Sequence, residues 1–470
     1  MDRLIKVGKI EPKSSKNVRT SRLGIGFEKL DRDIFDPEKA YDKVADLGVK
    51  WVRLQSGWQK TERQKGVYDF AWLDKIVDNL IARGLVPWMC LCYGNDLYNE
   101  KAKEIFGAVG CPPIFTEEER KAWDSYVRAI VKHFQGRVFD YEVWNEPDGA
   151  WCWKHGVNAT EYGVFARDTA KAVKETDPSI NVYAGAHCMP SISFINQALS
   201  TGMGEYLDAV TYHAYDTDER RSTYVASAVR ALARRYNSKI DVIQGETGAP
   251  SKTEGFGALW YCAWNERKQA KQLLRHCVSD LWAGVKFTSH FSCIDMVEAL
   301  NGKEGDVASY KDYGYFGLLA AEFDDEGRST GEYSPKPSYY AMQSIASIFA
   351  NEFETCEMPI FVFPKDSPRL YREKEAYAWD IRSGGFCRKN GSFAYAYWSP
   401  ASLMTTDYES TISMECSALP EDIRLIDTYD GSVYKIPESI MTKDEFGTVT
   451  LKNLPIKDYP LILTFGDFVE

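Results

Sequence analysis

The chain has 470 residues and a net charge of −11, because its 57 basic side chains are outnumbered by 68 acidic ones. Hydrophobic residues make up 44% of the chain and charged residues 27%, which is typical of a folded globular protein and excludes a disordered or collagen-like chain. An acidic chain without a basic block is a poor ligand for nucleic acid or for anionic membranes, so we expect neither partner. No run approaches the ~20 apolar residues that cross a bilayer.

The N-terminal residues, MDRLIKVGKIEPKSSKN, include basic side chains but lack the apolar core of a signal peptide. The 11 cysteines are scattered, and some, such as Cys90 and Cys92, lie in apolar runs. We therefore expect reduced, mostly buried thiols in a cytoplasmic protein. Cys90 and Cys92 lack zinc-ligand spacing, and the chain has no HExxH motif, so we expect no metal and no cofactor.

From Ser21 to about Ala350, short apolar runs alternate with longer amphipathic segments. Eight runs are predicted to be β-strands: residues 23–30, 49–55, 85–94, 138–146, 180–188, 208–216, 239–246 and 285–293. Helical patterns lie between or after them, for example at 70–84, 159–176, 224–236, 267–284 and 337–350. Eight strands that are each followed by a helix predict an α/β fold, a (β/α)8 TIM barrel over residues 21–352. A doubly wound open sheet would alternate in the same way, but no glycine-rich phosphate loop follows the first strand.

After residue 352 the pattern changes to short strand-like runs separated by Gly, Pro, Asn and Asp. These runs cover residues 361–363, 376–381, 391–398, 411–417, 423–436, 447–451 and 460–466. Asp430-Gly431 between two of the runs is a strong hairpin signal. We expect residues 353–470 to form an antiparallel β-sandwich, to which residues 1–20 could add a strand.

Two glutamates end predicted strands on opposite sides of this barrel. Glu146 ends the fourth strand in EVWNEPD, and Glu246 ends the seventh strand in VIQGETG. Chemistry in TIM barrels occurs at the C-terminal ends of the strands, and strands four and seven face each other across the mouth. A single glutamate at a strand end is usually a solvated rim residue, but the facing pair is harder to dismiss.

Two carboxylates about 5–5.5 Å apart are what retaining glycoside hydrolysis requires. Glu246 would attack the anomeric carbon, while Glu146 would protonate the leaving oxygen and then deprotonate the water that releases the sugar. Arg53 and Tyr215 are candidates to keep the nucleophile ionised. Asn145, beside the acid, could bind a sugar hydroxyl.

At these residues the sequence resembles the clan A glycoside hydrolases. EVWNEPD is similar to the strand-four motif of family 39, which includes β-xylosidases and α-L-iduronidases, and which ends in Asn-Glu with the Glu as acid/base. The His213-Ala-Tyr215 stretch resembles the clan's His-x-Tyr, whose Tyr contacts the nucleophile, and Arg53 matches the strand-two Arg. The resemblance implies a barrel followed by a β-sandwich. The chain departs from the pattern at strand eight, where His290 and Phe291 stand in place of a Trp found in many relatives, and in the QGETG context of Glu246.

Further substrate-binding candidates lie in the loops that follow the strands. Glu28 could bind a sugar hydroxyl or form a surface ion network, whereas for Lys29 we expect the surface. Aromatic side chains in these loops can stack on the apolar face of a sugar, although about half of such residues serve loop packing. The remaining candidates are Trp58, Tyr93, Trp151, His187, Trp260 and His290.

Three other functions compete with this prediction. A Schiff-base aldolase needs a lysine at a strand C-terminal end, but Lys286 begins the eighth strand instead. A metal-dependent hydrolase lacks its ligand motifs, and a non-catalytic sugar-binding barrel would not need both glutamates. We therefore expect a retaining, exo-acting glycoside hydrolase for short oligosaccharides or glycosides, β-xylosidase-like by resemblance. β-Galactosidase, β-glucosidase, β-glucuronidase and α-L-arabinofuranosidase activities remain open, as does a homo-oligomeric state.

Overall fold

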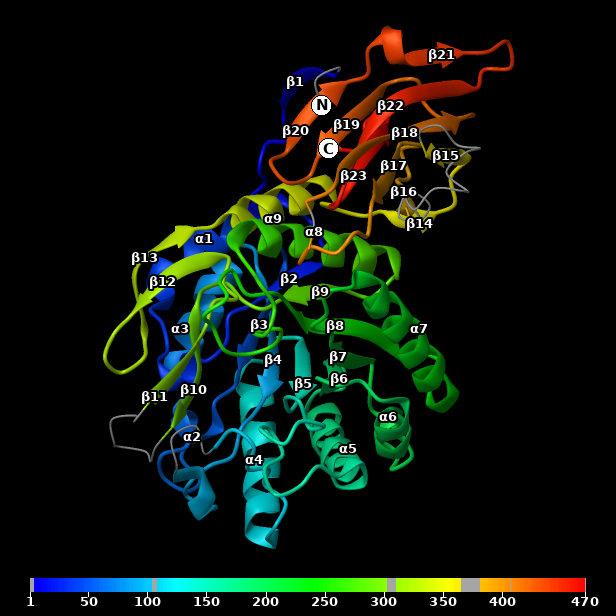
Figure 1. Ribbon diagram of the computed structural model, residues 1–470. Coiled ribbons are helices and arrows are strands. Elements are labelled where there is room, and N and C mark those ends of the chain that lie inside the picture. Colours follow the sequence, from blue (N-terminus) through cyan, green and yellow to red (C-terminus); the bar gives the residue numbers. More distant parts are fainter. Residues whose placement is uncertain (1–3, 104–107, 302–309, 365–380, 406, 470) are drawn as a thin grey trace.

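The computed structural model describes residues 4–103, 108–301, 310–364, 381–405 and 407–469. Eight parallel strands close into a barrel, which confirms the predicted TIM barrel (Figure 1). In order around the barrel they are β2 (Leu23–Gly26), β3 (Trp51–Gln55), β4 (Val86–Leu91), β5 (Asp140–Val143), β6 (Asn181–His187), β7 (Ala209–His213), β8 (Asp241–Thr247) and β9 (Thr288–His290).

Helices cover the outside of the barrel (Figure 1). They are α1 (Tyr41–Ala45), α3 (Ala71–Ala82), α4 (Glu117–His133), α5 (Ala159–Thr176), α6 (Ile192–Leu199), α7 (Glu219–Tyr236), α8 (Glu266–Trp282) and α9 (Pro337–Ile348), with a short α2 (Trp58–Thr61) in the loop after β3. Local signals fix several of their ends. Thr116 and Glu119, for example, form a capping box at the start of α4, with hydrogen bonds of 3.1 and 3.0 Å.

The inside of the barrel is filled by a layer of aromatic rings and, nearer the C-terminal ends of the strands, by a layer of charged groups. Trp51 of β3 stacks on Phe287 at 4.3 Å, and Trp88 of β4 meets the same ring edge-on at 5.1 Å. Side chains alternate along a strand, so Arg53, two residues after Trp51, also points inward. Its guanidinium lies 5.4 Å above the Trp88 ring, and this places a cation directly on the aromatic layer.

The long segment after β9 forms two hairpins beside the barrel mouth. They are β10 (Met296–Asn301) with β11 (Tyr310–Gly314), and β12 (Leu319–Phe323) with β13 (Ser329–Pro335). The buried ion pair between Lys336 and Asp295, at 2.6 Å, ties this insertion to the start of α9.

The second domain consists of two antiparallel sheets, as predicted. The larger sheet has the order β1-β20-β19-β23-β17-β16-β14 and the smaller one β15-β18-β22-β21. Their bounds are β1 (Ile5–Lys9), β14 (Glu354–Cys356), β15 (Ile360–Pro364), β16 (Arg382–Cys387), β17 (Phe393–Trp398), β18 (Glu409–Cys416), β19 (Ile423–Asp427), β20 (Ser432–Lys435), β21 (Met441–Lys443), β22 (Val449–Lys457) and β23 (Leu461–Phe465). Residues 376–380 of one predicted run lie outside the described residues.

Both chain ends lie in this domain, where β1 pairs with β20 (Figure 1). The expected hairpin at Asp430-Gly431 is confirmed between β19 and β20, and Gly431 has a φ of +73° that glycine adopts without strain. Helices α8 and α9 lie between the barrel and the sheets. Lys271 of α8 bonds Asp458 at 2.8 Å and Arg275 bonds the Ala401 carbonyl at 2.9 Å, so the two domains share buried polar contacts.

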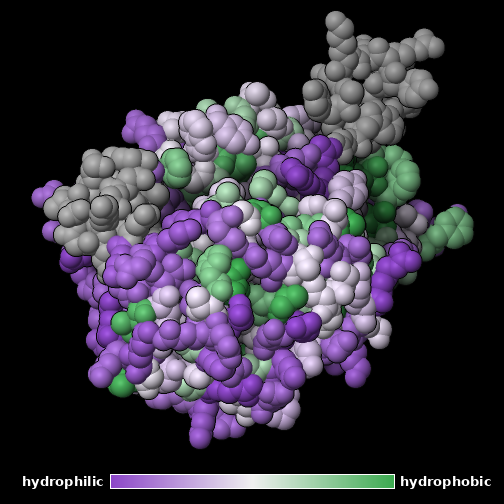
Figure 2. Space-filling view, turned by 90° about the horizontal axis from the view of Figure 1, so that it is seen from below, coloured by the Kyte–Doolittle hydropathy of each residue, from purple (hydrophilic) through white to green (hydrophobic). Residues whose placement is uncertain are grey.

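The face shown in Figure 2 is mainly hydrophilic, with apolar residues in small separate groups. Among the described residues, no helix combines the length and the apolarity that a bilayer crossing requires. All 11 cysteines are free thiols.

Candidate active site

Glu146 and Glu246 meet at the C-terminal mouth of the barrel. Glu146 follows β5, and Glu246 lies near the end of β8. Trp144 and Glu146 have positive φ angles of 65° and 45°, a turn that sends the chain across the strand end. One oxygen of each carboxylate and a ring nitrogen of His213 all lie within 4.8 Å of one another. The two side chains therefore converge on one small volume, as the opposed strands predict.

His213, at the end of β7, lies between the two carboxylates. Its Nδ1 is 2.9 Å from Glu146 Oε1 and 3.8 Å from Glu246 Oε2. Burial lowers the pKa of this imidazole, but the Glu246 charge and the Glu146 hydrogen bond outweigh burial and raise the pKa above its usual value. A protonated His213 would hold the two acids together.

Glu246 is held by two further groups. The Tyr215 hydroxyl donates to Oε1, and Arg53 Nη1 donates to Oε2 at 2.9 Å. Burial raises the pKa of Glu246 to about 7, although His213 and Arg53 oppose the rise. Glu246 therefore changes charge near neutral pH.

Arg53 is the hub of the site. It is fully buried and donates to Glu142 Oε2 from Nε at 2.9 Å and to Asn145 Oδ1 from Nη2 at 2.8 Å. Nη1 also contacts both oxygens of Glu28 at 3.2 Å. Burial lowers the pKa of a guanidinium, but these carboxylates raise the pKa of Arg53 well above its usual value. One cation thus faces three buried acids, Glu28, Glu142 and Glu246.

The raised pKa of Glu246 predicts a pH-dependent cost to folding. Between its usual pKa of 4.5 and about 7 the folded protein holds a proton that the unfolded chain has lost, so the free energy of unfolding falls as pH rises through this window. Glu246→Gln removes the titration, and we expect it to exceed the wild type in stability by about 1–3 kcal/mol at pH 8, with little difference near pH 4.5. Urea unfolding at both pH values measures this difference.

The control is Glu175→Gln on α5, because the Arg128 bond lowers the pKa of that surface carboxylate. The control should gain no stability at pH 8. An equal gain for Glu246→Gln at both pH values would contradict the account.

The structure places three of the predicted site residues in buried positions. Trp58 is 1% exposed, stacks on Tyr98 at 5.3 Å and donates to Glu62 at 2.5 Å, so it belongs to the helix layer rather than the mouth. His187 and His290 are buried, and their contact with substrate stays a prediction. Burial lowers the pKa of His187 to about 4 and that of His290 to about 3, so both rings are uncharged at neutral pH.

Three other predicted candidates lie at different depths in the mouth. Trp151 is half-exposed and donates to Glu146 Oε2 from its indole N–H. Tyr93 is buried, and its hydroxyl accepts from Gln55 Nε2 at 3.3 Å, which ties it to the network around Glu28. Trp260 is 56% exposed in the loop after β8, and its contact with substrate stays a prediction.

The sequence analysis did not identify the acids Glu142 and Glu298, and it expected Lys29 at the surface. Glu142 lies inside β5 rather than at its end, two residues after Asp140, so these two acids share one face of the strand. Lys29 is 8% exposed rather than on the surface, and its Nζ bonds Glu298 of β10 at 3.1 Å and the Val297 carbonyl at 2.8 Å. Lys29 and Glu298 are 269 positions apart, so no local sequence pattern indicates that they form an ion pair.

The carboxylate and imidazole groups of Glu146, His213 and Glu246 could also ligate a cation, since all three atoms face one point. The same side chains include the predicted acid/base and nucleophile. Removal of metal ions distinguishes the two uses.

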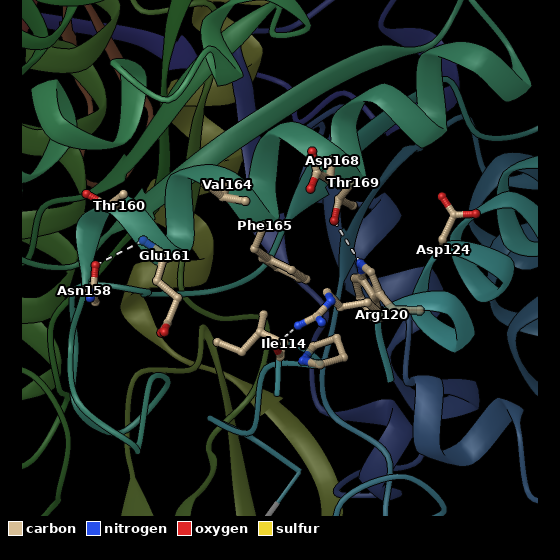
Figure 3. Close-up of a pocket in the computed structure, with 12 residues that line it drawn as sticks. Ile114, Arg120, Asp124, Asn158, Thr160, Glu161, Val164, Phe165, Asp168 and Thr169 are labelled. Carbon is tan, nitrogen blue, oxygen red and sulfur yellow. Dashed lines mark hydrogen bonds between the residues drawn. The ribbon is translucent and has the colours of Figure 1, made fainter. Parts of the chain in front are cut away.

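A pocket of about 400 Å³ lies outside the barrel, between α4 and α5 (Figure 3). The ring of Phe165 points toward Ile114 and Arg120 there. Neither Glu146 nor Glu246 lines it. The pocket is separated from the mouth by Trp144, which Phe165 contacts edge-on at 5.6 Å.

Comparison with known proteins identifies relatives of this chain and of its fold. A β-xylosidase from Geobacillus stearothermophilus is 30% identical over 219 residues, which is 42% of this chain and 42% of that enzyme, so the match spans less than half of the relative. A family 39 glycoside hydrolase from Bacteroides cellulosilyticus WH2 has the same fold, with a TM-score of 0.67 and 19% identity over 97% of this chain and 82% of that one. A monomeric β-xylosidase from Caulobacter crescentus CB15 also has this fold, with a TM-score of 0.60. It is 15% identical, and the match covers 98% of this chain and 97% of that one. The model described as "Glycosyl hydrolases family 39" matches residues 41–353, about two thirds of the sequence, and the chain therefore belongs to glycosyl hydrolase family 39.

Proposed function

We propose that this protein is a retaining, exo-acting glycoside hydrolase with β-xylosidase-like specificity for short oligosaccharides or glycosides. The observation that carries the proposal is the convergence of Glu146 and Glu246 oxygens within 4.8 Å. Retaining enzymes hold their carboxyl groups about 5–5.5 Å apart, whereas inverting enzymes need about 6.5–9.5 Å to admit a water between them. The short separation supports the retaining course.

In the first step Glu246 attacks the anomeric carbon and forms a glycosyl ester. Glu146 gives its proton to the glycosidic oxygen, the bond from that oxygen to the anomeric carbon breaks, and the alcohol leaves. Arg53 and Tyr215 hold Glu246 in place for the attack through one hydrogen bond to each carboxylate oxygen. The attack itself neutralises Glu246 and so relieves the excess of buried negative charge around Arg53.

In the second step Glu146 takes a proton from water, and the water oxygen attacks the same carbon. The ester bond breaks, Glu246 regains its charge, and the sugar leaves with its original configuration. Esterification of Glu246 removes the larger of the charges that raise the pKa of His213. The imidazole should then release its proton more readily during this step.

Two observations support exo action and the cellular setting. Lys29, just after β2, bonds Glu298 and the Val297 carbonyl of the insertion after β9, and these bonds hold the insertion beside the mouth. The free thiols of all 11 cysteines support the reducing cytoplasm as the place of action.

The test is hydrolysis of a panel of nitrophenyl glycosides with the product anomers followed by NMR. We expect the β-D-xyloside to be among the best substrates, with β-xylose appearing before mutarotation, and no loss of rate in EDTA. Initial release of the α-anomer from a β-glycoside would overturn the retaining proposal, and inactivation by EDTA would favour a metal at the carboxylates.

Glu146→Ala should separate the roles of the two acids. The variant should still be glycosylated by dinitrophenyl glycosides, whose leaving group needs no proton, but the glycosyl-enzyme should persist because no base activates water. Azide should raise turnover at least 10-fold and yield a glycosyl azide of retained configuration, detected by NMR. Absence of rescue would argue against Glu146 as the acid/base.

A further inference from the structure

Both oxygens of the Glu146 carboxylate are occupied in the structure. Oε1 lies 2.9 Å from Nδ1 of the fully buried His213. Oε2 accepts a hydrogen bond from the indole Nε1 of Trp151, a side chain that is 52% exposed. Since the imidazole lies inward and the indole outward, Oε2 is the oxygen on the solvent side of the carboxylate.

The backbone that carries Trp151 is anchored on both sides. The Asp148 carboxylate accepts hydrogen bonds from the backbone N–H groups of residues 188 and 189, at 3.0 and 2.9 Å. On the other side, the Cys152 carbonyl accepts from Trp144 Nε1 at 2.9 Å. The exposed Trp151 side chain can therefore turn about its own bonds while the loop stays in place.

A glycine provides the resting position of the indole. A Cβ on Gly149 would lie 2.6 Å from Cε2 and 3.0 Å from Nε1 of Trp151, far inside contact distance. The ring thus lies flat against the bare backbone of Gly149, and this brings its N–H to Glu146. Any larger residue at this position would push the indole away from the carboxylate.

The indole N–H and the leaving group need the same place. An indole nitrogen donates a hydrogen bond and cannot accept one. A glycosidic oxygen that is to receive the proton of Glu146 must lie next to the accessible oxygen, Oε2, where the indole N–H lies in the free enzyme. Substrate binding therefore requires that Trp151 move.

We propose that Trp151 is a side-chain gate, which covers Glu146 Oε2 in the free enzyme and turns onto the flat face of the leaving group when substrate binds. The inference rests on the proposed function. The displaced indole lies beside the departing group, and its ring face suits a pyranose or aryl ring, whose apolar face can stack on it. The gate thus selects ring-shaped leaving groups over small alcohols.

The test compares kcat/KM for β-xylobiose, whose leaving group is a pyranose, with kcat/KM for methyl β-D-xyloside. In Trp151→Ala the xylobiose value should fall about 10-fold, while the methyl xyloside value should stay level or rise because nothing competes for Oε2. Trp151→Phe keeps a ring without the N–H and should stay within about 3-fold of the wild type on xylobiose. Tyr224→Ala, an exposed aromatic residue on α7, is the matched control and should leave both values unchanged.

The possible results distinguish failure of the Trp151 gate from failure of the proposed glycoside hydrolase function. A 10-fold fall in the preference for xylobiose in Trp151→Ala, restored in Trp151→Phe, supports the gate. An equal loss on both substrates, or no change, overturns the gate and leaves the hydrolase intact. A wild type that hydrolyses neither these nor any glycoside of the panel overturns both.

Discussion

Glu246→Gln is expected to lower kcat/KM on an aryl β-glycoside by about 10⁴–10⁶-fold, the size of effect seen when a catalytic nucleophile is removed. Glutamine can accept the Arg53 hydrogen bond with its amide oxygen and donate to the Tyr215 hydroxyl oxygen with its NH2 group, but the amide oxygen is too weak a nucleophile to form the glycosyl ester. The loss should appear in kcat, because the pocket that binds the sugar is preserved. Steady-state kinetics with a nitrophenyl substrate measure the change.

The result is specific to this carboxylate if Glu205→Gln, an exposed acid outside the barrel, keeps wild-type activity. The inactive variant should also be folded, and above neutral pH it should be more stable than the wild type. A loss of less than 100-fold would shift the nucleophile away from Glu246, with Glu28 as the next acid on the Arg53 hub.

Arg53→Met is expected to cost about 3–5 kcal/mol of folding free energy or more, because it leaves buried carboxylates without their cation. Arg53 is fully buried, and its guanidinium is bonded to Glu142, Glu28 and Glu246. Lysine would not repair the loss, since a point charge cannot satisfy several acceptors arranged around a planar fork. Urea or guanidinium unfolding gives the change as a lower midpoint at an unchanged slope.

Two variants keep this prediction testable if Arg53→Met yields little protein. Arg53→Met combined with Glu142→Gln removes one of the stranded charges and should recover part of the stability. Arg128→Met on α4 removes an exposed cation paired with Asp124 and Glu175 and should cost less than about 1 kcal/mol. If Arg53→Met lies within 1 kcal/mol of the wild type, the hub does not stabilise the barrel.

The barrel and the carboxylate pair could be predicted because both depend on local pattern. Most barrel strands lie in short apolar runs, and residues such as Val242 and Ile243 of β8 are buried on both faces of the sheet. The two glutamates lie at the C-terminal ends of their strands, so the closure of the barrel brings them together. No long-range contact had to be predicted for this. The same reasoning gave Arg53, Asn145 and Tyr215, which also lie at or near the C-terminal ends of strands.

The aromatic candidates show where such reasoning stops. Trp58 and Trp151 both follow strands, yet Trp58 turns into the helix layer while Trp151 lies beside Glu146. The direction of a loop side chain depends on the neighbouring loops, which strand spacing does not determine. His187 ends β6 as predicted, but strand spacing does not reveal that Asp148 of the loop after β5 lies 3.9 Å from its ring.

Long-range ion pairs were not predictable for a related reason. Glu142 is a charged residue inside β5, and the partner that compensates it, Arg53, belongs to β3. Lys29 looked like a surface residue because Glu298, its partner, belongs to an insertion far along the chain. Burial of a charged side chain can be predicted only when its ion-pair partner is known, and a partner on a distant segment is not visible in the sequence.

The central claim is that Glu246 becomes covalently attached to the sugar while Glu146 exchanges protons across from it. The direct measurement is inactivation by a dinitrophenyl 2-deoxy-2-fluoro-β-xyloside, followed by mass spectrometry of the intact protein and of its peptides. We expect a mass increase of one fluorosugar, located on the peptide that contains Glu246. A label on another residue, or full turnover of the reagent with no adduct at any time, would contradict it.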